Sequence, residues 1–191
     1  KTSPDIAAVL NITPNHLDVH PSMEDYVASK ANILAYQGKE AVAVLGADDM
    51  TASSLEGVAK GKKLWFSAAG KVGAGAFLRR DELVLRQGGK DDVVALTRGD
   101  IHLPGMHNVL NVLAAMAVSS AAGAEASDMK EAVDGFRGVE HRLETAAEGG
   151  GVVVVHAAAR ARVREPERLP AHVVHGAVAV EPRRGLARDV P

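Results

Sequence analysis

Residues 5–18 read DIAAVLNITPNHLD, and this stretch decides the fold class of the chain. Its first eight residues are almost all apolar, which is typical of a parallel strand covered on both faces. Residues 13–15 then supply turn chemistry, and His16, Asp18 and His20 follow directly. Ligands of open α/β sheets gather beyond the carboxyl ends of the strands, so these side chains stand where a site is expected. Taken singly, His16 also fits a structural histidine and Asp18 a turn residue.

A helix is predicted directly after this turn region. Ser22 and Asp25 form the S-x-x-D signal, in which a side-chain oxygen caps free backbone N–H groups. Lys30 falls on the apolar face of that helix, where burying an ammonium group without a partner is costly. The amine must find an anion, lose its proton or be modified, unless the stem covers apolar surface and the amine reaches water. The apolar residues that share this face by their spacing are Met23, Tyr26, Val27, Ile33 and Leu34.

Residues 11–30, NITPNHLDVHPSMEDYVASK, resemble the central-domain signature of the Mur ligases, the ATP-dependent amide ligases of peptidoglycan precursor synthesis. The resemblance implies that His16 binds Mg²⁺ and that Lys30 is carbamylated and helps to position Mg²⁺. Both residues are therefore expected in the catalytic centre. Carbamylation would turn the misplaced amine into a carboxylate-like anion, which suits a hard cation. Asn15 stands where the family commonly has an acidic residue.

A second motif opens a long apolar helix that is predicted to continue to residue 122. Residues 103–111 read LPGMHNVLN, and asparagine is a poor residue for a helix interior. Asn108 and Asn111 nevertheless stand three apart and share one face near the helix start. Capping would explain Asn108 but not Asn111 as well. In the Mur ligases the HN-x-x-N motif contacts ATP, and the resemblance assigns that contact to Asn108 and Asn111.

Residues 138–144 read GVEHRLE and resemble the family motif whose arginine contacts the ATP phosphates. The resemblance assigns this role to Arg142, whose planar guanidinium can grip phosphate oxygens in pairs. Standing alone, Arg142 would be taken as a surface or ion-paired arginine. Among the family members, this segment is most similar to that of the ligase for D-glutamate. Other Mur ligases and a folylpolyglutamate synthetase-like ligase remain alternatives.

The expected activity follows from this resemblance. It implies an enzyme that uses ATP and Mg²⁺ to join D-glutamate to UDP-N-acetylmuramoyl-L-alanine through an acyl phosphate. We expect a cytoplasmic monomer without nucleic-acid or membrane partners. The net charge of −2 argues against a nucleic-acid-binding surface, and the absence of cysteine excludes disulfides and thiol catalysis. No apolar run reaches the length needed to span a bilayer.

Residues 1–150 are predicted to form a partial central ATP-binding domain of the α/β class. We expect a mostly parallel sheet flanked by helices, with a small antiparallel portion. No G-x-x-x-x-G-K-[ST] phosphate loop occurs in the sequence. Two stretches combine glycine and lysine with the wrong spacing, 57–63 and 70–75, and both are predicted to be surface loops. Asp48 and Asp49 are expected to cap a helix, and an approach to the nucleotide is the alternative. Further strands are predicted at 40–46, 62–68, 82–86 and 92–96, and a further helix at 126–136.

Residues 151–191 differ in composition from the rest of the chain. From residue 152 onward there is no Lys, Asn, Gln, Ser, Thr, Ile, Met or aromatic residue. A packed domain uses a more balanced set, so we expect an aberrant tail, such as an out-of-frame translation, in place of an amino-acid-binding domain. A natural arginine-rich tail for an acidic partner is the alternative. On this interpretation the chain is an inactive fragment of a ligase, and a non-catalytic nucleotide- or protein-binding module is the remaining alternative.

Overall fold

The computed structural model describes residues 1–14, 20–89, 91–138, 144–149, 152–156 and 177–180. Its α-helices are α1 (Met23–Ala35), α2 (Met50–Ser54), α3 (Met106–Ala121) and α4 (Ala126–Gly135), and two 3₁₀ turns are η1 (Leu55–Gly57) and η2 (Arg98–Asp100). The strands are β1 (Ile6–Val9), β2 (Val42–Gly46), β3 (Lys62–Ser67), β4 (Gly75–Arg79), β5 (Glu82–Arg86), β6 (Val93–Thr97), β7 (Glu144–Gly149), β8 (Val152–His156) and β9 (Ala177–Val180). None of the helices in these ranges is both long and apolar enough to cross a membrane.

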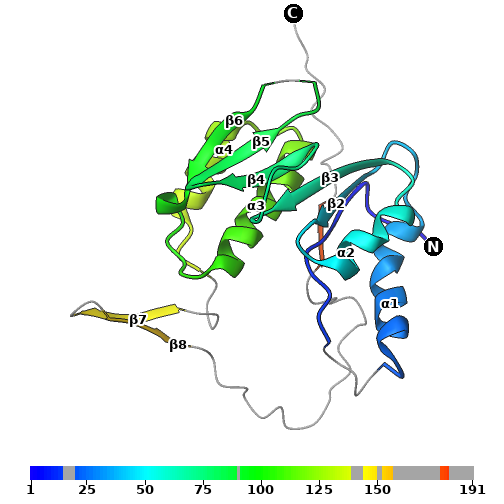
Figure 1. Cartoon of the computed structure of the whole chain (residues 1–191), viewed down its shortest axis with the longest axis horizontal. Helices are drawn as coiled ribbons and strands as arrows, with labels where there is room; N and C mark the ends of the chain where they lie inside the picture. Colours follow the sequence, from blue (N-terminus) through cyan, green and yellow to red (C-terminus); the bar gives the residue numbers. More distant parts are fainter. Residues whose placement is uncertain (15–19, 90, 139–143, 150–151, 157–176, 181–191) are drawn as a thin grey trace, which may run out of the picture.

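The main sheet has seven strands in the order β6-β5-β4-β3-β2-β1-β9 (Figure 1). The pairs β1–β2, β2–β3 and β3–β4 are parallel. The pairs β4–β5, β5–β6 and β1–β9 are antiparallel, so the antiparallel strands lie toward the two edges of the sheet. Strands β7 and β8 form a separate two-stranded sheet. The predicted α/β fold with a parallel centre and an antiparallel portion is confirmed.

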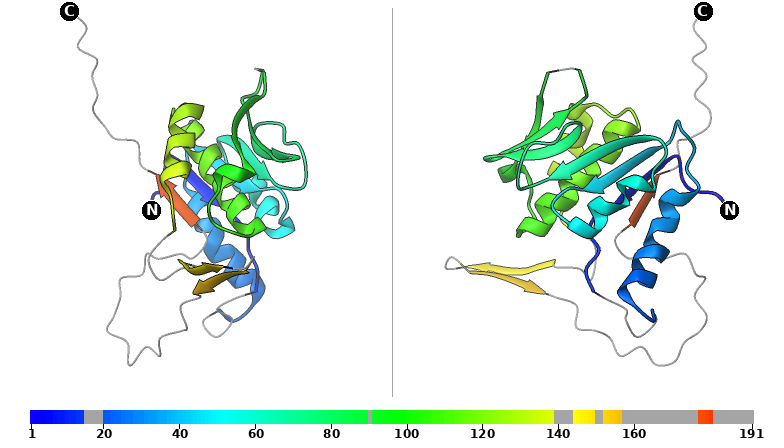
Figure 2. Two further views of the ribbon diagram at one scale, coloured as in Figure 1. Left: turned by 90° about the vertical axis from the view of Figure 1, so that its left-hand side faces the viewer. Right: turned by 45° about the vertical axis from the view of Figure 1, so that its right-hand side comes forward.

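Helices cover both faces of the sheet, which explains the continuous apolar run of β1. All four β1 residues are buried, and successive side chains point to opposite faces. Ile6 and Ala8 join the core that contains α3 and α4, whereas Ala7 and Val9 join the core that contains α1 and α2. Figure 2 shows the two helix layers from two further sides. A strand that is buried on both faces needs apolar residues at every position. The sequence prediction of such a strand is confirmed.

Helix α1 begins where the start signal places it. Ser22 is its N-cap, and the Ser22 hydroxyl accepts a hydrogen bond from the Asp25 backbone N–H at 3.2 Å. Strands β2, β3, β5 and β6 and helices α3 and α4 also lie where the sequence predicts them, within three residues. Their apolar periodicity is a local signal, which is why the sequence alone was sufficient.

Strand β4 was not predicted, and the expectation of a surface loop for residues 70–75 is wrong at two points. Val72 is buried at 8% exposure, and Gly75 is the first residue of β4. Gly75 has a φ of +123°, and a Cβ built on it would lie 1.9 Å from the carbonyl oxygen of Trp65. Only glycine fits this close approach between neighbouring strands.

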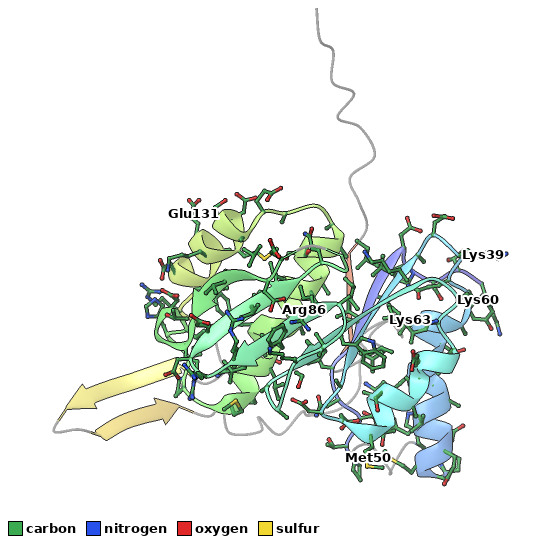
Figure 3. All side chains as sticks on the ribbon, turned by 45° about the horizontal axis from the view of Figure 1, so that its top comes forward. Lys39, Met50, Lys60, Lys63, Arg86 and Glu131 are labelled. Atoms are coloured by element: carbon green, nitrogen blue, oxygen red, sulfur yellow. The ribbon has the colours of Figure 1, made fainter. Side chains whose placement is uncertain are left out.

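The other glycine- and lysine-containing stretch, 57–63, lies far from the carboxyl ends of the strands. Gly57 ends η1, and β3 begins at Lys62. Figure 3 shows Lys39, Lys60 and Lys63 together at the end of the sheet where β2 and β3 begin. Because ligands of α/β sheets bind at the opposite edge, this stretch is no substitute for a phosphate loop.

Candidate functional site

A pocket of about 230 Å³ opens at the carboxyl ends of β1 and β2, beside the start of α3. We call it the sheet-edge pocket. It lies where the sequence predicts a ligand site, beyond the end of the first strand. Its lining residues are Leu10, Asn11, Gly46, Asp48, Asp49, Phe66, His107, Leu110 and Asn111.

Gly46 allows the backbone to pass closely at the floor of this pocket. A Cβ on Gly46 would lie 2.1 Å from the carbonyl oxygen of Leu10, so a larger residue would force β1 and β2 apart. Asp49 follows as the N-cap of α2, and its Oδ1 accepts a hydrogen bond from the Ala52 backbone N–H at 2.7 Å. The prediction that an aspartate caps this helix is confirmed for Asp49.

Asp48 has a different role from the predicted cap. Its carboxylate accepts hydrogen bonds from the Ser67 hydroxyl at 2.5 Å and from the Ala68 backbone N–H at 2.7 Å. The Ser67 hydroxyl in turn accepts hydrogen bonds from the backbone N–H groups of Ala69 and Gly70. Asp48 therefore fixes the turn after β3 at the rim of the sheet-edge pocket. The sequence could not reveal this role, because the partners come from a neighbouring strand.

The two motif asparagines have different surroundings on α3. Asn108 is buried at 7% exposure, and its Nδ2 donates a hydrogen bond to the Pro104 carbonyl oxygen at 2.7 Å. This contact holds the turn before α3 in place. Asn111 is exposed and lines the sheet-edge pocket. Of the two amides, Asn111 is the one that is open to a ligand.

A second pocket, of about 410 Å³, lies between α3 and α4. We call it the interhelical pocket. Asn111 lines this pocket as well, so its side chain stands between the two cavities. Asn108, one helical turn earlier on α3, lines the interhelical pocket too. The remaining lining residues are mostly apolar, and they are Ile101, His102, Leu103, Val112, Ala115, Ala132, Val133 and Phe136.

Lys30 lies on the buried face of α1, as its spacing predicts. Tyr26, Lys30 and Leu34 repeat every four residues and are the buried residues of this helix. Lys30 is 6% exposed, and its Nζ lies 5.2 Å from the centroid of the Tyr26 ring. Helix α1 covers the face of the sheet opposite to α3. Lys30 lines neither the sheet-edge pocket nor the interhelical pocket.

The predicted site residues His16 and Arg142 lie outside the described residues. The expected meeting of His16 with Lys30 around Mg²⁺ and the expected contact of Arg142 with phosphates therefore stay predictions. Within the part of the chain that the structure describes, no three His, Asp or Glu side chains gather closely enough to hold a metal ion. Of the predicted site residues, the structure brings Asn108 and Asn111 together at one pocket.

Two pocket residues were missed by the sequence analysis, His107 and Asn11. His107 belongs to the same HN-x-x-N motif and lines the sheet-edge pocket from the first turn of α3. Asn11 ends the apolar run of the first strand and lines the same pocket. A polar residue directly after a buried strand is the signal that would have found Asn11.

Comparison with known proteins identifies the family. The Mur ligase middle domain matches residues 1–119. The chain is 44% identical over 144 residues to UDP-N-acetylmuramoylalanine--D-glutamate ligase of Symbiobacterium thermophilum, covering 74% of this chain and 31% of the relative. It is 43% identical over 152 residues to the ligase of the same name from Acidobacterium capsulatum, covering 78% and 32%. The chain thus spans about a third of the length of these curated relatives.

Solved structures of other ligases show the same fold. MurF from Acinetobacter baumannii superposes with a TM-score of 0.61 at 20% identity, over 81% of this chain and 34% of that protein. A pseudomurein peptide ligase type C from Methanothermus fervidus gives a TM-score of 0.57 at 17% identity, over 74% of this chain and 36% of that protein. At these identities the likeness concerns the fold. The sequence match over residues 1–119 carries the assignment, and the chain belongs to the Mur ligase middle-domain family.

Proposed function

We propose that this chain supplies the ATP-binding part of a ligase that joins D-glutamate to UDP-N-acetylmuramoyl-L-alanine. The 44% identity to a ligase named for D-glutamate supports this choice of substrate. In the proposed reaction, the carboxylate of the nucleotide-linked substrate accepts the γ-phosphoryl group of ATP and becomes an acyl phosphate. The amine of D-glutamate then displaces phosphate as the amide bond forms.

The interhelical pocket supports nucleotide binding, and this is the observation that carries the proposal. Its apolar walls suit the faces of a purine ring, and its few polar side chains are two asparagine amides and the His102 imidazole. The Asn111 amide offers both an acceptor and two donors, which is the pattern needed to recognise the edge of adenine. We propose that Asn111 contacts the base and that Asn108 holds the turn that shapes the pocket.

For the phosphate and metal roles we propose other residues of the chain. We propose that Arg142 grips the ATP phosphates and that His16 and a carbamylated Lys30 hold Mg²⁺. The buried position of Lys30 fits this role, because a carbamate would give the amine an anionic oxygen donor of the kind Mg²⁺ prefers. When bound, Mg²⁺ would neutralise charge on the phosphates. A cytoplasmic monomer without nucleic-acid or membrane partners remains our expectation.

A calorimetric titration of the chain with ATP and Mg²⁺ tests the nucleotide site. We expect Asn111→Ala to weaken ATP binding by about tenfold, because losing a hydrogen bond to the ligand costs roughly 1 to 1.5 kcal/mol. Asn32→Ala is the matched control, since Asn32 is an exposed asparagine on α1. Asn108→Ala is a poorer test, because it also removes the hydrogen bond to Pro104. Equal affinity of wild type and Asn111→Ala, or no binding by wild type, would contradict the proposal.

The second candidate function is nucleotide binding without catalysis. It is favoured by the absence of a G-x-x-x-x-G-K-[ST] motif from the sequence, since that loop cradles phosphates in the family. Measuring phosphate release from ATP in the presence of UDP-N-acetylmuramoyl-L-alanine and D-glutamate separates the two candidates. We expect the chain alone to bind ATP without turnover, and substrate-dependent phosphate release would show that it is a complete catalyst.

A further inference from the structure

An aromatic contact links Lys30 to the segment before α1. The Lys30 Nζ lies 5.2 Å from the centroid of the Tyr26 ring, one helical turn earlier. The His20 ring lies 5.0 Å from the same ring, at an interplanar angle of 50°. Tyr26 and Lys30 are both buried, at 7% and 6% exposure. The tyrosine ring therefore touches the lysine amine and the histidine within a largely covered space.

His20 is itself held by the first turn of the helix. Its Nδ1 lies 2.7 Å from the Asp25 Oδ2, and its side chain is only 21% exposed. The backbone N–H of Asp25 donates to the Ser22 hydroxyl, so the carboxylate stands on a capped turn. A continuous set of contacts thus runs from the helix cap through Asp25, His20 and Tyr26 to Lys30.

We propose that Tyr26 is a positioning residue for Lys30 and that the His20–Asp25 pair holds the Tyr26 ring. This inference rests on the proposed function, because it concerns the lysine that we place at the Mg²⁺ site. A lysine stem has four rotatable carbon–carbon bonds and loses much rotamer freedom when its end is fixed. A ring face that covers the stem restricts those rotamers before the carbamate forms or any ligand binds. A donor ordered in advance binds its cation more tightly.

The experiment follows the Lys30 ε-CH₂ group by NMR in the whole 191-residue chain, with ¹³C-labelled lysine, in bicarbonate buffer titrated with Mg²⁺. Lys30→Arg identifies the signal by its disappearance. Tyr26→Leu removes the ring, and Tyr26→Phe keeps it. Tyr36→Leu is the matched control, because Tyr36 ends the same helix and its ring contacts Lys1, with Nζ 5.7 Å from the centroid.

In Tyr26→Leu we expect the ring-current shift of the Lys30 signal to vanish and the Mg²⁺ midpoint to rise by roughly fivefold, which corresponds to about half of the rotamer entropy that a lysine side chain loses on ordering. Tyr26→Phe and Tyr36→Leu should match wild type. His20→Ala should raise the midpoint in the same direction by a smaller factor. A purely structural role would lower the melting temperature without moving the Mg²⁺ midpoint of the folded protein.

A folded Tyr26→Leu chain whose Lys30 signal and Mg²⁺ midpoint equal those of wild type overturns the inference. If Tyr26→Leu does not fold, His20→Ala decides, and an unchanged Lys30 signal there overturns it. Failure of wild-type Lys30 to respond to Mg²⁺ and bicarbonate would instead refute the proposed metal role. In that case the positioning of Lys30 is judged by the ring-current shift and the mobility of its ε-CH₂ group. Tyr26→Leu must change both quantities, and Tyr36→Leu must change neither.

Discussion

Three polar residues of the motifs differ in what surrounds each side chain. Asn108 is buried and satisfied by a backbone carbonyl, and Asn111 is exposed between two pockets. Lys30 is buried with its amine over an aromatic ring. All three occupy helix positions where the sequence flagged an unusual residue. An unusual residue type in a helix shows which positions to examine. Only the surroundings of the side chain show whether it makes a structural hydrogen bond or is open to a ligand.

Gly75 gives the sharpest prediction at the scale of a single residue. We expect Gly75→Ala to lower the free energy of unfolding by about 2 to 4 kcal/mol, because the new Cβ would meet the Trp65 carbonyl and the φ of +123° is strained for alanine. Gly73→Ala is the control, since nothing lies within 4 Å of a Cβ at Gly73. Urea unfolding of both variants measures the difference. Equal stability of the two would show that β3 and β4 do not approach each other as described.

At the scale of elements, one ion pair ties α4 to the edge of the sheet. The Lys130 Nζ of α4 lies 2.5 Å from the Asp100 Oδ1 of η2. The other Asp100 oxygen accepts a hydrogen bond from the Thr97 backbone N–H at 2.7 Å, which closes the capping box of this turn. Asp100 therefore joins the end of β6 to a helix that begins 26 residues later in the chain.

This ion pair predicts a pH dependence of stability. The hydrogen bond from Lys130, followed by that from Thr97, lowers the pKa of Asp100 to about 2. The pKa of Asp100 in the folded chain therefore lies below its unfolded value of about 3.9. The stabilisation by ionised Asp100 is fully present above a pH of about 3.9, and it is lost as the pH falls through about 2. The stability difference between wild type and Asp100→Asn should thus be constant near neutral pH and shrink in acid. Urea unfolding at a series of pH values measures it.

Asp81→Asn is the control for this experiment. The Asp81 side chain is 83% exposed, and its ion pair with Arg98 is longer, at 3.7 Å. Exposed pairs of this kind contribute little, so Asp81→Asn should change the unfolding free energy less than Asp100→Asn does at neutral pH. A stability difference for Asp100→Asn that grows in acid would contradict the assigned ion pair.

At the scale of the whole molecule, each face of the main sheet packs against its own layer of helices. Leu113 of α3 and Leu34 of α1 are both fully buried, one on each face. Because the same strands contribute side chains to both cores, we expect the two faces to unfold together. Leu113→Ala and Leu34→Ala should each lower the free energy of unfolding by about 2 to 5 kcal/mol, with a single transition. Comparing fluorescence and circular dichroism transitions tests this, and two separate transitions would refute it.

The sequence by itself determined the elements whose signals are local. The apolar run of β1, the Ser22 cap and the four-residue spacing of Tyr26, Lys30 and Leu34 can all be recognised within a few residues. The same holds for the HN-x-x-N motif at the start of α3. The α/β class follows from these elements, because strands buried on both faces require helices on both sides.

The tertiary structure decided everything that depends on contacts between distant segments. It alone showed that Gly75 begins a strand against β3 and that Asp48 fixes the turn after β3. It also placed Asn111 between two pockets and the Lys30 amine against Tyr26. Strand pairing, cavities and ring contacts arise from atoms that meet only after the chain has folded, so no pattern within a single segment encodes them.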